Sequence, residues 1–533
     1  MSDSSNRSPW TPLTNPLFRR LWLASIVSNV GTWMQNVGAA WLMTSLAPSA
    51  FMVALVQTAT YLPVFLLGIP AGAVADIVDR RKLLILTQTW MLLAAGVLGA
   101  MTIAGVVGPW SLLWLTFALG LGSTMNAPAW QAIVPELIPR PDLPAAIALN
   151  SMGFNLARAA GPALGGLAVA TMGAGGAFIL NGVSFVAVIV VLYLWKRAPE
   201  YTTTLTETVG SAMTAGLRYV RFAPAMHGVL WRSGSFVLVA SGLWALLPSV
   251  ARIELHREST GYGLLLGCLG AGSILGALTV ARLRQILRPE LMVTLATVLF
   301  GCSNLALAYL ERFSLVALAL VAGGAAWMIV NSTLNTAAQT SLPAWVRARA
   351  LSVYLLVFQS AMALGGVIWG AMATRFGLRF TLLVAGLCLL VVAAATARLR
   401  LHWSKEVDVA PSAHWPEPHL VVAPELEQGP VLVQMEYRVS PEQAHEFTRA
   451  MQPVRLIRRR DGAIRWSLWR DAAEPGRYVE NFVVANWAEH LRQHERITVA
   501  DRSLEEKAMS YHLGPERPRV THWISARAFQ KEE

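Results

Sequence analysis

Long, unbroken apolar runs dominate the sequence from Leu17 onward and constrain the fold more than any other feature. Each run has roughly 20 to 28 residues, enough to cross a hydrocarbon core of about 30 Å at 1.5 Å per residue. Because lipid offers no hydrogen-bond partners, only helices or closed barrels span it, and continuous runs lack the alternation of barrel strands. The sequence therefore predicts twelve membrane-spanning helices, at residues 18–45, 51–76, 83–107, 110–134, 144–171, 177–196, 225–250, 259–282, 290–310, 313–340, 348–373 and 378–398.

Charged residues are distributed unevenly along the chain. Residues 1–428 hold 26 Lys and Arg and 16 Asp and Glu, whereas residues 429–533 hold 17 and 15. This contrast excludes a wholly soluble protein and predicts a membrane part followed by a soluble domain. Of the net charge of +12, the membrane part carries +10. That excess favours topology signals and lipid headgroups over nucleic acid as its explanation.

Basic residues also predict the orientation in the membrane. Residues 1–16 lack the apolar core and small-residue cleavage site of a signal peptide, so we expect them to stay attached. With this segment inside, fifteen Lys and Arg fall in the expected cytoplasmic connections, and only five fall on the opposite side. Those five are Arg252, Arg257, Arg312, Arg375 and Arg379. The positive-inside rule therefore predicts that both termini and the soluble domain are cytoplasmic.

The spans divide into two sets of six. The longest connection within the membrane part, about 197–223, separates halves at about 17–196 and 224–400 within a domain of residues 1–404. Gln131 and Gln339 each begin a Gln-x3-Pro sequence at the ends of the fourth and tenth spans, 208 residues apart. Two parallel six-helix halves with a site between them form the major facilitator architecture.

The connection after the second span carries a distinctive group of residues, Gly72, Asp76, Arg80 and Arg81. A glycine permits close helix packing, and a carboxylate at a helix end pairs with arginine or with a helix N-terminus. We therefore expect these residues to form a lock that breaks and re-forms during transport. The alternative is a plain positively charged cytoplasmic turn.

The fifth span contains Gly161, Pro162, Gly165 and Gly166 within two turns. Small residues permit tight helix packing and a proline bends a helix, so the segment is expected to act as a hinge or a seal. Generic small-residue packing is the alternative.

Two arginines, Arg158 and Arg232, lie within the spans, whereas no acidic residue is expected in the middle of one. A guanidinium inside a membrane is costly unless it faces a cavity or a partner. We therefore expect them, with Asn155, Gln131 and Gln339, to line a path for an anionic or catecholate-like substrate. The alternative is that backbone carbonyls cap the guanidinium groups. Other amides and indoles within the spans either line the same cavity or bond neighbouring helices.

The soluble part begins after a linker at residues 405–429 that is rich in Pro, Ala, Val and Glu. Residues 430–528 show strands at 431–439, 463–470, 478–485 and 519–525, with helices at 441–459 and 487–510. This βαββαβ order predicts a ferredoxin-like α+β domain. His490 and His494 have the spacing of two metal ligands on one helix face, but no third ligand is evident, so we predict no metal site.

Together, the loop after the second span and the Gly-Pro-x-x-Gly-Gly sequence at Gly161 to Gly166 resemble motifs of the major facilitator superfamily, the second being typical of exporters. Ile77 and Asp79 depart from the loop signature, and Ala148 and Ala157 replace glycines of the exporter motif. With the appended domain, the chain resembles the transmembrane secretion effector branch, which includes enterobactin-exporter-like proteins. The appended domain resembles the small dimeric α+β barrels related to antibiotic-biosynthesis monooxygenases.

This resemblance implies a multi-pass exporter of the bacterial inner membrane that moves a siderophore or drug-like amphiphile by alternating access, as a proton antiporter. It implies no catalytic residues and no cofactor, with the small-molecule substrate, protons and membrane lipids as partners. A homodimer formed through the C-terminal domain is also expected. The alternative function is a membrane-anchored enzyme or sensor that acts through that domain. An ATP-driven pump is disfavoured because the sequence has no phosphate-binding P-loop.

Overall fold

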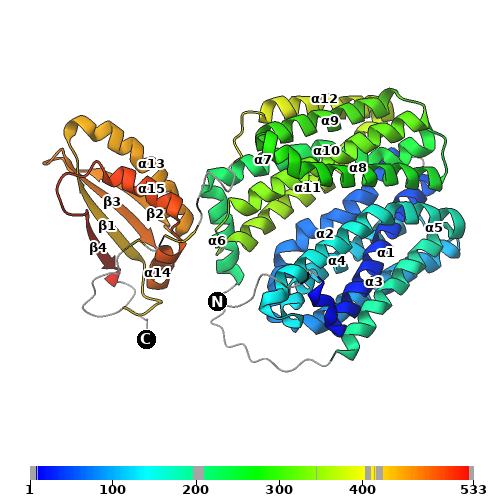
Figure 1. Ribbon diagram of the computed structural model, residues 1–533, viewed down its shortest axis with the longest axis horizontal. Coiled ribbons are helices and arrows are strands. Elements are labelled where there is room, and N and C mark those ends of the chain that lie inside the picture. Colours follow the sequence, from blue (N-terminus) through cyan, green and yellow to red (C-terminus); the bar gives the residue numbers. More distant parts are fainter. Residues whose placement is uncertain are drawn as a thin grey trace. The chain divides into compact units, whose positions relative to one another are not determined.

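The structure is a computed structural model of the full chain. It describes residues 8, 10–47, 49–195, 209–343, 345–401, 408, 410–412, 414–415 and 424–526. Residues 197–208 of the predicted connection lie outside the described part, as does about half of the predicted linker at 405–429. In the described part, long helices make up residues 16–396 and a small antiparallel sheet comes after them (Figure 1).

The first half of the membrane part consists of α1 (Pro16–Leu46), α2 (Ala50–Ile77), α3 (Arg80–Ile103), α4 (Pro109–Leu137) and α5 (Leu143–Leu194). Side chains cap two of these helices. Asn15 accepts hydrogen bonds from the backbone of Leu17 and Phe18 at the start of α1, and Asp79 accepts one from Lys82 at the start of α3. The long α5 holds both the fifth and the sixth predicted spans, which Gly173 separates with a positive φ of 72°.

The second half consists of α7 (Pro224–Ser249), α8 (Ser259–Ile286), α9 (Pro289–Tyr309), α10 (Phe313–Thr340), α11 (Arg347–Phe376) and α12 (Leu378–Thr396). Each of the twelve predicted spans therefore falls on a helix. By length and apolarity, nine helices in the described part qualify as membrane spans. The polar residues of α1 and α4 keep these two below that limit, and α5 is counted once.

The connection between the halves contains a helix that the sequence analysis did not predict. Residues Val209–Phe222 form α6, which is amphipathic, unlike the spans around it. Tyr219 and Val220 on one face are buried, whereas Leu217 and Arg221 are exposed. A 14-residue helix is too short to cross a hydrocarbon core.

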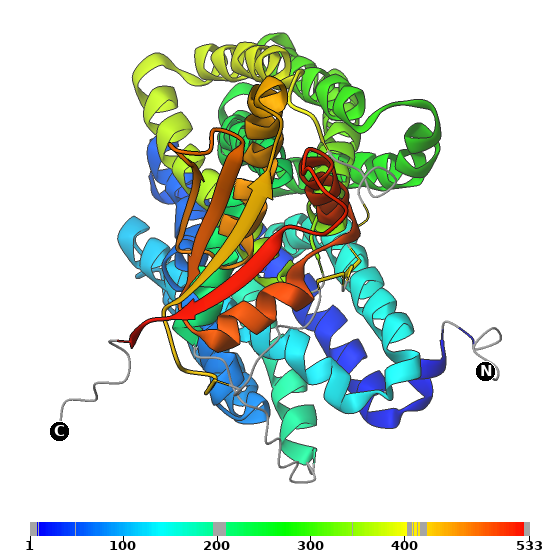
Figure 2. The ribbon, with the colours of Figure 1, turned by 90° about the vertical axis from the view of Figure 1, so that its left-hand side faces the viewer.

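The C-terminal domain has the predicted order of strands and helices. It comprises β1 (Val431–Arg438), α13 (Ala444–Asp461), β2 (Arg465–Arg470), β3 (Arg477–Val484), α14 (Trp487–Arg496), α15 (Val499–Met509) and β4 (Arg519–Ile524). The strands pair antiparallel in the order β2-β3-β1-β4 and lie side by side in Figure 2. One predicted helix, 487–510, is in fact two, because Thr498 accepts the backbone hydrogen bond of Asp501 and begins a new helix.

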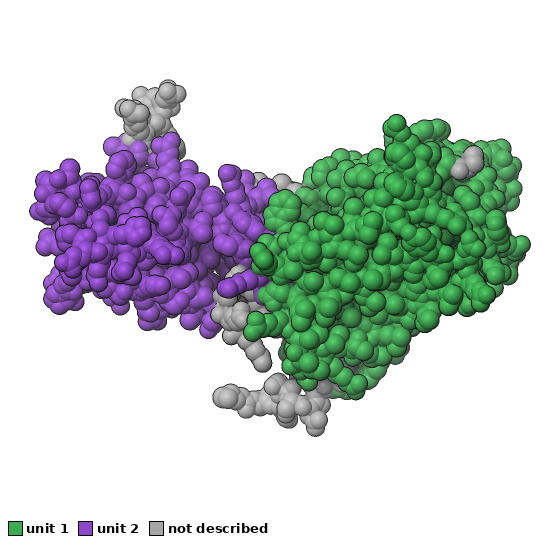
Figure 3. Space-filling model, turned by 90° about the horizontal axis from the view of Figure 1, so that it is seen from above, with its two compact units in different colours: residues 1–204, 231–334, 355–399 green, residues 205–230, 335–354, 400–533 purple. Residues whose placement is uncertain are grey.

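The chain forms two compact units, coloured in Figure 3. The first holds residues 1–204, 231–334 and 355–399, and the second holds residues 205–230, 335–354 and 400–533. The second unit therefore joins the C-terminal domain to α6 and to the segment around the start of α11. Parts of the predicted linker also pack on this domain, since the indole of Trp415 and the imidazole of His414 bond to Glu505 at 2.9 Å.

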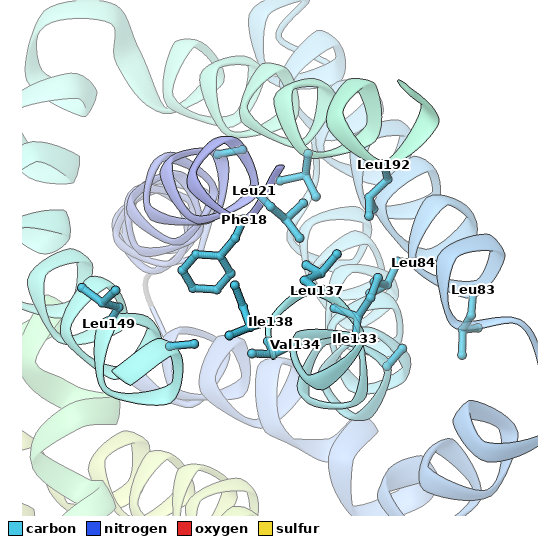
Figure 4. Packing of buried hydrophobic residues seen from close by; sticks show 14 of the residues in the cluster. Phe18, Leu21, Leu83, Leu84, Ile133, Val134, Leu137, Ile138, Leu149 and Leu192 are labelled. Atoms are coloured by element: carbon cyan, nitrogen blue, oxygen red, sulfur yellow. The ribbon is translucent and has the colours of Figure 1, made fainter. Parts of the chain in front are cut away.

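Packing differs between the inside and the outside of the first unit. Phe18 and Leu21 of α1, Leu84 of α3 and Ile133 of α4 meet in a buried cluster within the first half (Figure 4). The outer face of α3 is also apolar, at Leu86, Trp90, Leu93 and Val97, whose exposed fractions lie between 48% and 67%. A helix that is apolar all round is expected in lipid.

Glycines allow the closest helix contacts, and α5 uses three of them. A Cβ atom built on Gly161 would lie 2.5 Å from the Cβ of Trp33 in α1, and one on Gly165 would lie 2.9 Å from the Cα of Met34. A Cβ on Gly166 would lie 2.6 Å from the Cα of Gly263 in α8, so here the two halves touch backbone to backbone. A role of this segment as a hinge or a seal stays a prediction.

One predicted contact is absent from the described part of the chain. A Cβ atom on Gly72 would meet nothing within 4 Å, so this glycine does not hold two described helices together. Close helix packing at Gly72 therefore stays a prediction, since the described residues make no close contact with this glycine.

The contact between Gly166 and Gly263 can be tested with a pair of matched substitutions. We expect Gly166→Ala to destabilise the protein by about 1–3 kcal/mol, because backbone atoms cannot move away from the added methyl group. Gly96→Ala in α3 is the control, since a Cβ there would meet nothing within 4 Å. Thermal unfolding of both variants in the same detergent measures the difference. Equal unfolding temperatures would contradict the contact.

Candidate functional site

A cavity of about 260 Å³ lies inside the first unit, where helices of both halves meet. We call it the central cavity. Seven of its twenty lining residues are aromatic: Trp33, Tyr61, Phe154, Trp244, Tyr262, Trp327 and Phe358. Polar side chains at Asn36, Gln57, Thr60, Arg158 and Gln359 interrupt this wall. Such a mixture of flat apolar surfaces and a few polar groups is typical of a small-molecule site.

The polar groups of the central cavity offer hydrogen-bond donors, acceptors and one positive charge, that of Arg158. The Gln57 amide donates to the backbone oxygen of Met362 at 3.0 Å and the Thr60 hydroxyl to that of Val56 at 2.9 Å, which leaves their oxygens as acceptors. The indole nitrogens of Trp244 and Trp327 are buried and have no partner among the described residues. Of the described residues, none with a carboxylate lines the cavity or forms an ion pair with Arg158. The site is therefore suited to an anion or to an oxygen-rich aromatic compound.

A second cavity of about 260 Å³ adjoins the first between α5 and α8. We call it the side cavity. Trp33, Arg158, Trp244 and Leu266 line both cavities. Asn155 is in the wall of the side cavity, but its amide already donates a hydrogen bond to the backbone oxygen of Ser151 at 2.9 Å.

The halves also touch at the end of the bundle where α1 ends and α2 begins, which we call the far end. Arg252 donates a hydrogen bond to Thr44 at 2.9 Å and lies 5.7 Å from the ring of Trp41. The backbone nitrogen of Phe51 donates to the Thr374 hydroxyl at 2.9 Å. Deeper in the bundle, Thr58 donates to the backbone oxygen of Ala363 at 2.8 Å. These contacts close the far end over the central cavity.

The five predicted path residues do not come together. Arg158 lines both cavities and Asn155 lines the side cavity. Gln131 and Gln339 are exposed and line neither cavity, and Gln339 donates to Asn335 in its own helix at 2.7 Å.

Arg232 occupies a different kind of site from Arg158. It is 1% exposed, and its guanidinium donates to the backbone oxygens of Glu290, Ala397 and Leu399 at 2.9 to 3.1 Å. It lines neither cavity. The capping alternative therefore holds for Arg232, because carbonyls left over at the end of α12 need donors.

The predicted lock residues make contacts within the first half. Arg80 donates to Glu136 of α4 at 2.7 Å, and Arg81 donates to the backbone oxygens of Leu192 and Tyr193 at the end of α5, at 2.6 and 2.8 Å. The side chain of Asp76 lies outside the described part of the chain. No described contact of Arg80 or Arg81 reaches the second half.

Sequence reasoning missed the aromatic residues Tyr61, Trp244, Tyr262 and Trp327. A signal was present, because tryptophan prefers the membrane interfaces, whereas Trp33, Trp244 and Trp327 lie well inside their spans. Indoles far from the interface indicate a polar interior, in which the indole N–H group can donate a hydrogen bond.

The second unit contains a group of arginines around one buried carboxylate. Arg218 of α6 donates to Glu489 of α14 at 2.7 Å, and Arg496 donates to the same oxygen at 2.6 Å. Burial alone would raise the pKa of Glu489, but these arginines hold it below its usual value. Arg496 also lies 4.5 Å from the ring of Trp345, which precedes α11.

Cation–π contacts extend this interface along α6. The guanidinium of Arg459 lies 5.0 Å from the ring of Phe222, and that of Arg460 lies 5.3 Å from the ring of Tyr219. Asp501 holds Arg460 in place through a hydrogen bond of 2.6 Å. We call these contacts, together with Arg218–Glu489 and Arg496–Trp345, the α6 clamp.

Three histidines meet inside the C-terminal domain. The ring of His490 lies 5.0 Å from that of His494 and 4.7 Å from that of His522 on β4. Burial lowers the pKa of His490 to about 3 and that of His494 to about 4. Within the described residues, no group of three or more His, Cys, Asp or Glu side chains is arranged to hold a metal ion.

The sequence matches one family model and is similar to several bacterial transporters. A family model described as transmembrane secretion effector matches residues 7–530. The multidrug efflux pump Tap of Mycolicibacterium fortuitum is 27% identical over 406 residues, which cover 73% of this chain and 96% of Tap. The enterobactin exporter EntS of Escherichia coli O1:K1 / APEC is 26% identical over 73% of this chain and 94% of its own. The staphyloferrin A transporter of Staphylococcus aureus is 23% identical over 68% of this chain and 91% of its own.

Solved structures show the same fold at lower identity. An inward-facing bacterial homologue of the human lysosomal transporter Spinster matches with a TM-score of 0.59 and 16% identity, over 72% of this chain and 95% of its own. An inward-facing bacterial homologue of the iron transporter ferroportin matches with a TM-score of 0.56 and 17% identity, over 72% of this chain and 99% of its own.

The buried histidines predict how the C-terminal domain responds to pH. Because the pKa of His490 is lower in the folded state than the usual 6.5, only the unfolded chain gains a proton below that pH. His490 alone then removes about 1.4 kcal/mol of stability per pH unit as the pH falls from about 6. Hydrogen exchange of β1 and β3 in the full-length protein, corrected for intrinsic rates, measures this loss. His490→Phe should make the stability of the domain less dependent on pH between pH 6 and 5. An unchanged pH dependence would contradict the role of His490.

Proposed function

This chain belongs to the transmembrane secretion effector family, and we propose that it is a secondary active transporter that exports a small amphiphilic molecule by alternating access. The family consists of transporters, so the chain is a multi-pass membrane protein with the major facilitator fold and not an enzyme. Its relatives include drug efflux pumps and siderophore exporters. Twelve spans in two six-helix halves form the expected transport domain.

The observation that carries this proposal is the composition of the central cavity. Seven aromatic rings, one guanidinium and two buried indole N–H groups surround a space in which no described carboxylate is found. Aromatic faces bind flat, apolar molecules, and the donors bind their oxygen atoms. A siderophore or a drug-like compound with acidic or phenolic oxygens has this chemistry.

The closed far end fits one state of an alternating-access cycle. Under the positive-inside rule the far end faces away from the cytoplasm, both termini are cytoplasmic, and the membrane is the bacterial inner membrane. The cavity is then closed on the side to which an exporter must release its substrate. Export occurs when the contacts at Arg252, Phe51 and Thr58 break and the halves close at the opposite end.

Proton antiport is the proposed source of energy, in line with the family. Because no described carboxylate lines the cavities, a proton carrier would lie elsewhere. Glu136, which pairs with Arg80 at 2.7 Å beside the proposed lock of Gly72, Asp76 and Arg81, is an acidic residue that proton binding would release from an arginine. In this proposal Gly161, Pro162, Gly165 and Gly166 form the packed surface on which the halves rock.

Replacing Arg158 tests the proposed path. We expect Arg158→Ala to lower efflux at least about tenfold at a normal level of membrane protein, because the substrate loses its charge partner. Arg158→Lys should keep part of the activity, since it keeps the charge but not the fork of donors. Efflux from everted vesicles against a panel of dyes, antibiotics and catecholate siderophores, with and without a protonophore, is the measurement.

Arg232→Ala provides the contrast, because it should lower the amount of folded protein rather than the transport rate per molecule. Normal efflux in Arg158→Ala would remove the path role. Export that a protonophore does not affect would contradict proton coupling.

A second function, favoured by the α6 clamp, is control of transport by the C-terminal domain acting as a sensor. The clamp fixes the helix that joins the two halves to a domain whose described residues line neither cavity. In this proposal the domain also forms a homodimer through the sheet face not covered by its helices, where Trp469 and Trp523 are 62% and 55% exposed.

The clamp is tested by substitutions at two arginines of α6. Arg218→Ala should raise the hydrogen-exchange rate of α6 by about tenfold, because the buried Glu489 carboxylate loses a charged donor. Arg221→Ala is the matched control, since Arg221 is exposed and forms no described ion pair. Efflux measured on the same variants completes the test. Faster exchange with unchanged efflux would reject a regulatory role.

A further inference from the structure

The side cavity differs in chemistry from the central cavity that it adjoins. Leu266, Leu269, Ile274, Leu278 and Met328 supply aliphatic and thioether surface along most of its length. It carries few polar groups, and those of Ser273 and Asn155 are already used within the protein. Ser273 donates to the backbone oxygen of Leu269 at 3.0 Å, and Asn155 donates to that of Ser151 at 2.9 Å. The charged group in the wall of the side cavity is the guanidinium of Arg158, which also lines the central cavity.

The crossing of α5 and α8 explains the position of the side cavity. The helices touch at Gly166 and Gly263, and Ala163 still lies within 3.6 Å of a Cβ built on Gly267. Beyond this crossing, toward the start of α5, the side chains of Arg158 and Asn155 border open space. The two helices diverge from this contact, and the space between them is bordered by side chains of α1, α5, α7, α8 and α10.

The side cavity is elongated. Its wall on α8 runs from Leu266 to Leu278, a rise of about 18 Å at 1.5 Å per residue. Two of its residues near the second end of this run, Ile274 and Leu278, are 49% and 70% exposed. The side cavity therefore joins the central cavity at Arg158, and its wall is more exposed toward Leu278.

We propose that the side cavity binds a single aliphatic chain of an anionic amphiphile whose charged group is held by Arg158 at the junction of the two cavities. This inference rests on the proposed function and names the substrate class more closely. Burial of each methylene group in apolar surroundings strengthens binding about fourfold. An anion without a chain would fill only the central cavity, and a neutral hydrocarbon would lack the interaction with Arg158.

An aliphatic chain at this place has two possible sources. It belongs either to the transported molecule or to a phospholipid of the bilayer, which presents the same hydrocarbon. The proposal commits to the transported molecule, because the junction with the central cavity carries the charge that a free carboxylate needs. A phospholipid chain that enters from the exposed side along α8 brings its terminal methyl group toward Arg158, and its phosphate stays at the bilayer surface.

The experiment measures binding of linear alkanoates from six to twelve carbons to the full-length protein in phosphatidylcholine nanodiscs. Empty nanodiscs give the partitioning into lipid, which is subtracted. We compare the wild type with Ala277→Phe and Ala277→Leu, which place a larger side chain in the side cavity. Leu275→Phe is the matched control, since Leu275 is 52% exposed on the same helix and lines neither cavity.

The expected result is a ratio of dissociation constants, variant over wild type, that is near one for hexanoate and rises to about tenfold for dodecanoate. The smaller Ala277→Leu change should give a smaller rise, and Leu275→Phe should give a ratio near one at every length. A ratio that does not depend on chain length in both Ala277 variants overturns the proposal.

A photoreactive group at the end of the chain distinguishes the two sources. A dodecanoate with a terminal diazirine should label α8 between Leu269 and Leu278, and unlabelled dodecanoate should compete with it. A phosphatidylcholine with the same group in its acyl chain should not label these residues more than the lipid-facing side of α3. Labelling of the cavity by the phospholipid and not by the carboxylate would overturn the proposal.

Failure of this inference and failure of the proposed function are distinguishable. If efflux requires Arg158 but binding ignores chain length, the side-cavity proposal fails and the exporter proposal stands. If chain-dependent binding is found but no compound of any class is exported, the exporter proposal fails and the binding site stands.

Discussion

Hydrocarbon cannot hydrogen-bond to a protein backbone, and this constraint determines most of the architecture of the membrane part. Each long apolar run must become a helix that satisfies its own backbone groups. Once formed, these helices gain little from apolar contact with each other, because lipid is equally apolar. Their association depends on close packing, which explains why glycines are found where α5 meets α1 and α8. The point of contact between Gly166 and Gly263 also sets where the helices separate, and hence where the cavities lie.

Two arginines inside the membrane part respond differently to the same constraint, one bonded to the backbone and the other facing the cavities. Arg232 donates to three backbone oxygens, two of them just beyond the end of α12, so the protein itself supplies acceptors for its guanidinium. Arg158 has no carboxylate partner among the described residues and borders both cavities. A charge that the fold does not neutralise is available to a ligand, and this difference between two similar arginines supports the exporter proposal.

The C-terminal domain adds a second level of organisation. It is held to α6 by a buried carboxylate shared between Arg218 and Arg496, and by arginines that lie over aromatic rings. Charges with several partners of this kind stay ionised even when buried. The helix between the two halves is therefore fixed to the C-terminal domain, and the proposed control of transport rests on this contact.

The sequence by itself determined the long apolar helices and the order of strands in the C-terminal domain, because apolar length and alternation are local properties of the chain. It missed the amphipathic α6, which has neither signal. It also identified Arg158, since a guanidinium in an apolar run is conspicuous. It did not separate Arg158 from Arg232, because the partners of Arg232 are backbone oxygens 58 to 167 residues away. The tertiary structure alone decided that Gly72 is not a packing contact among the described helices, that Gln131 and Gln339 are outside the cavities, and that Trp244 and Trp327 are in the wall. Each of these depends on which helix faces turn toward each other, and that is settled only when all the helices pack together.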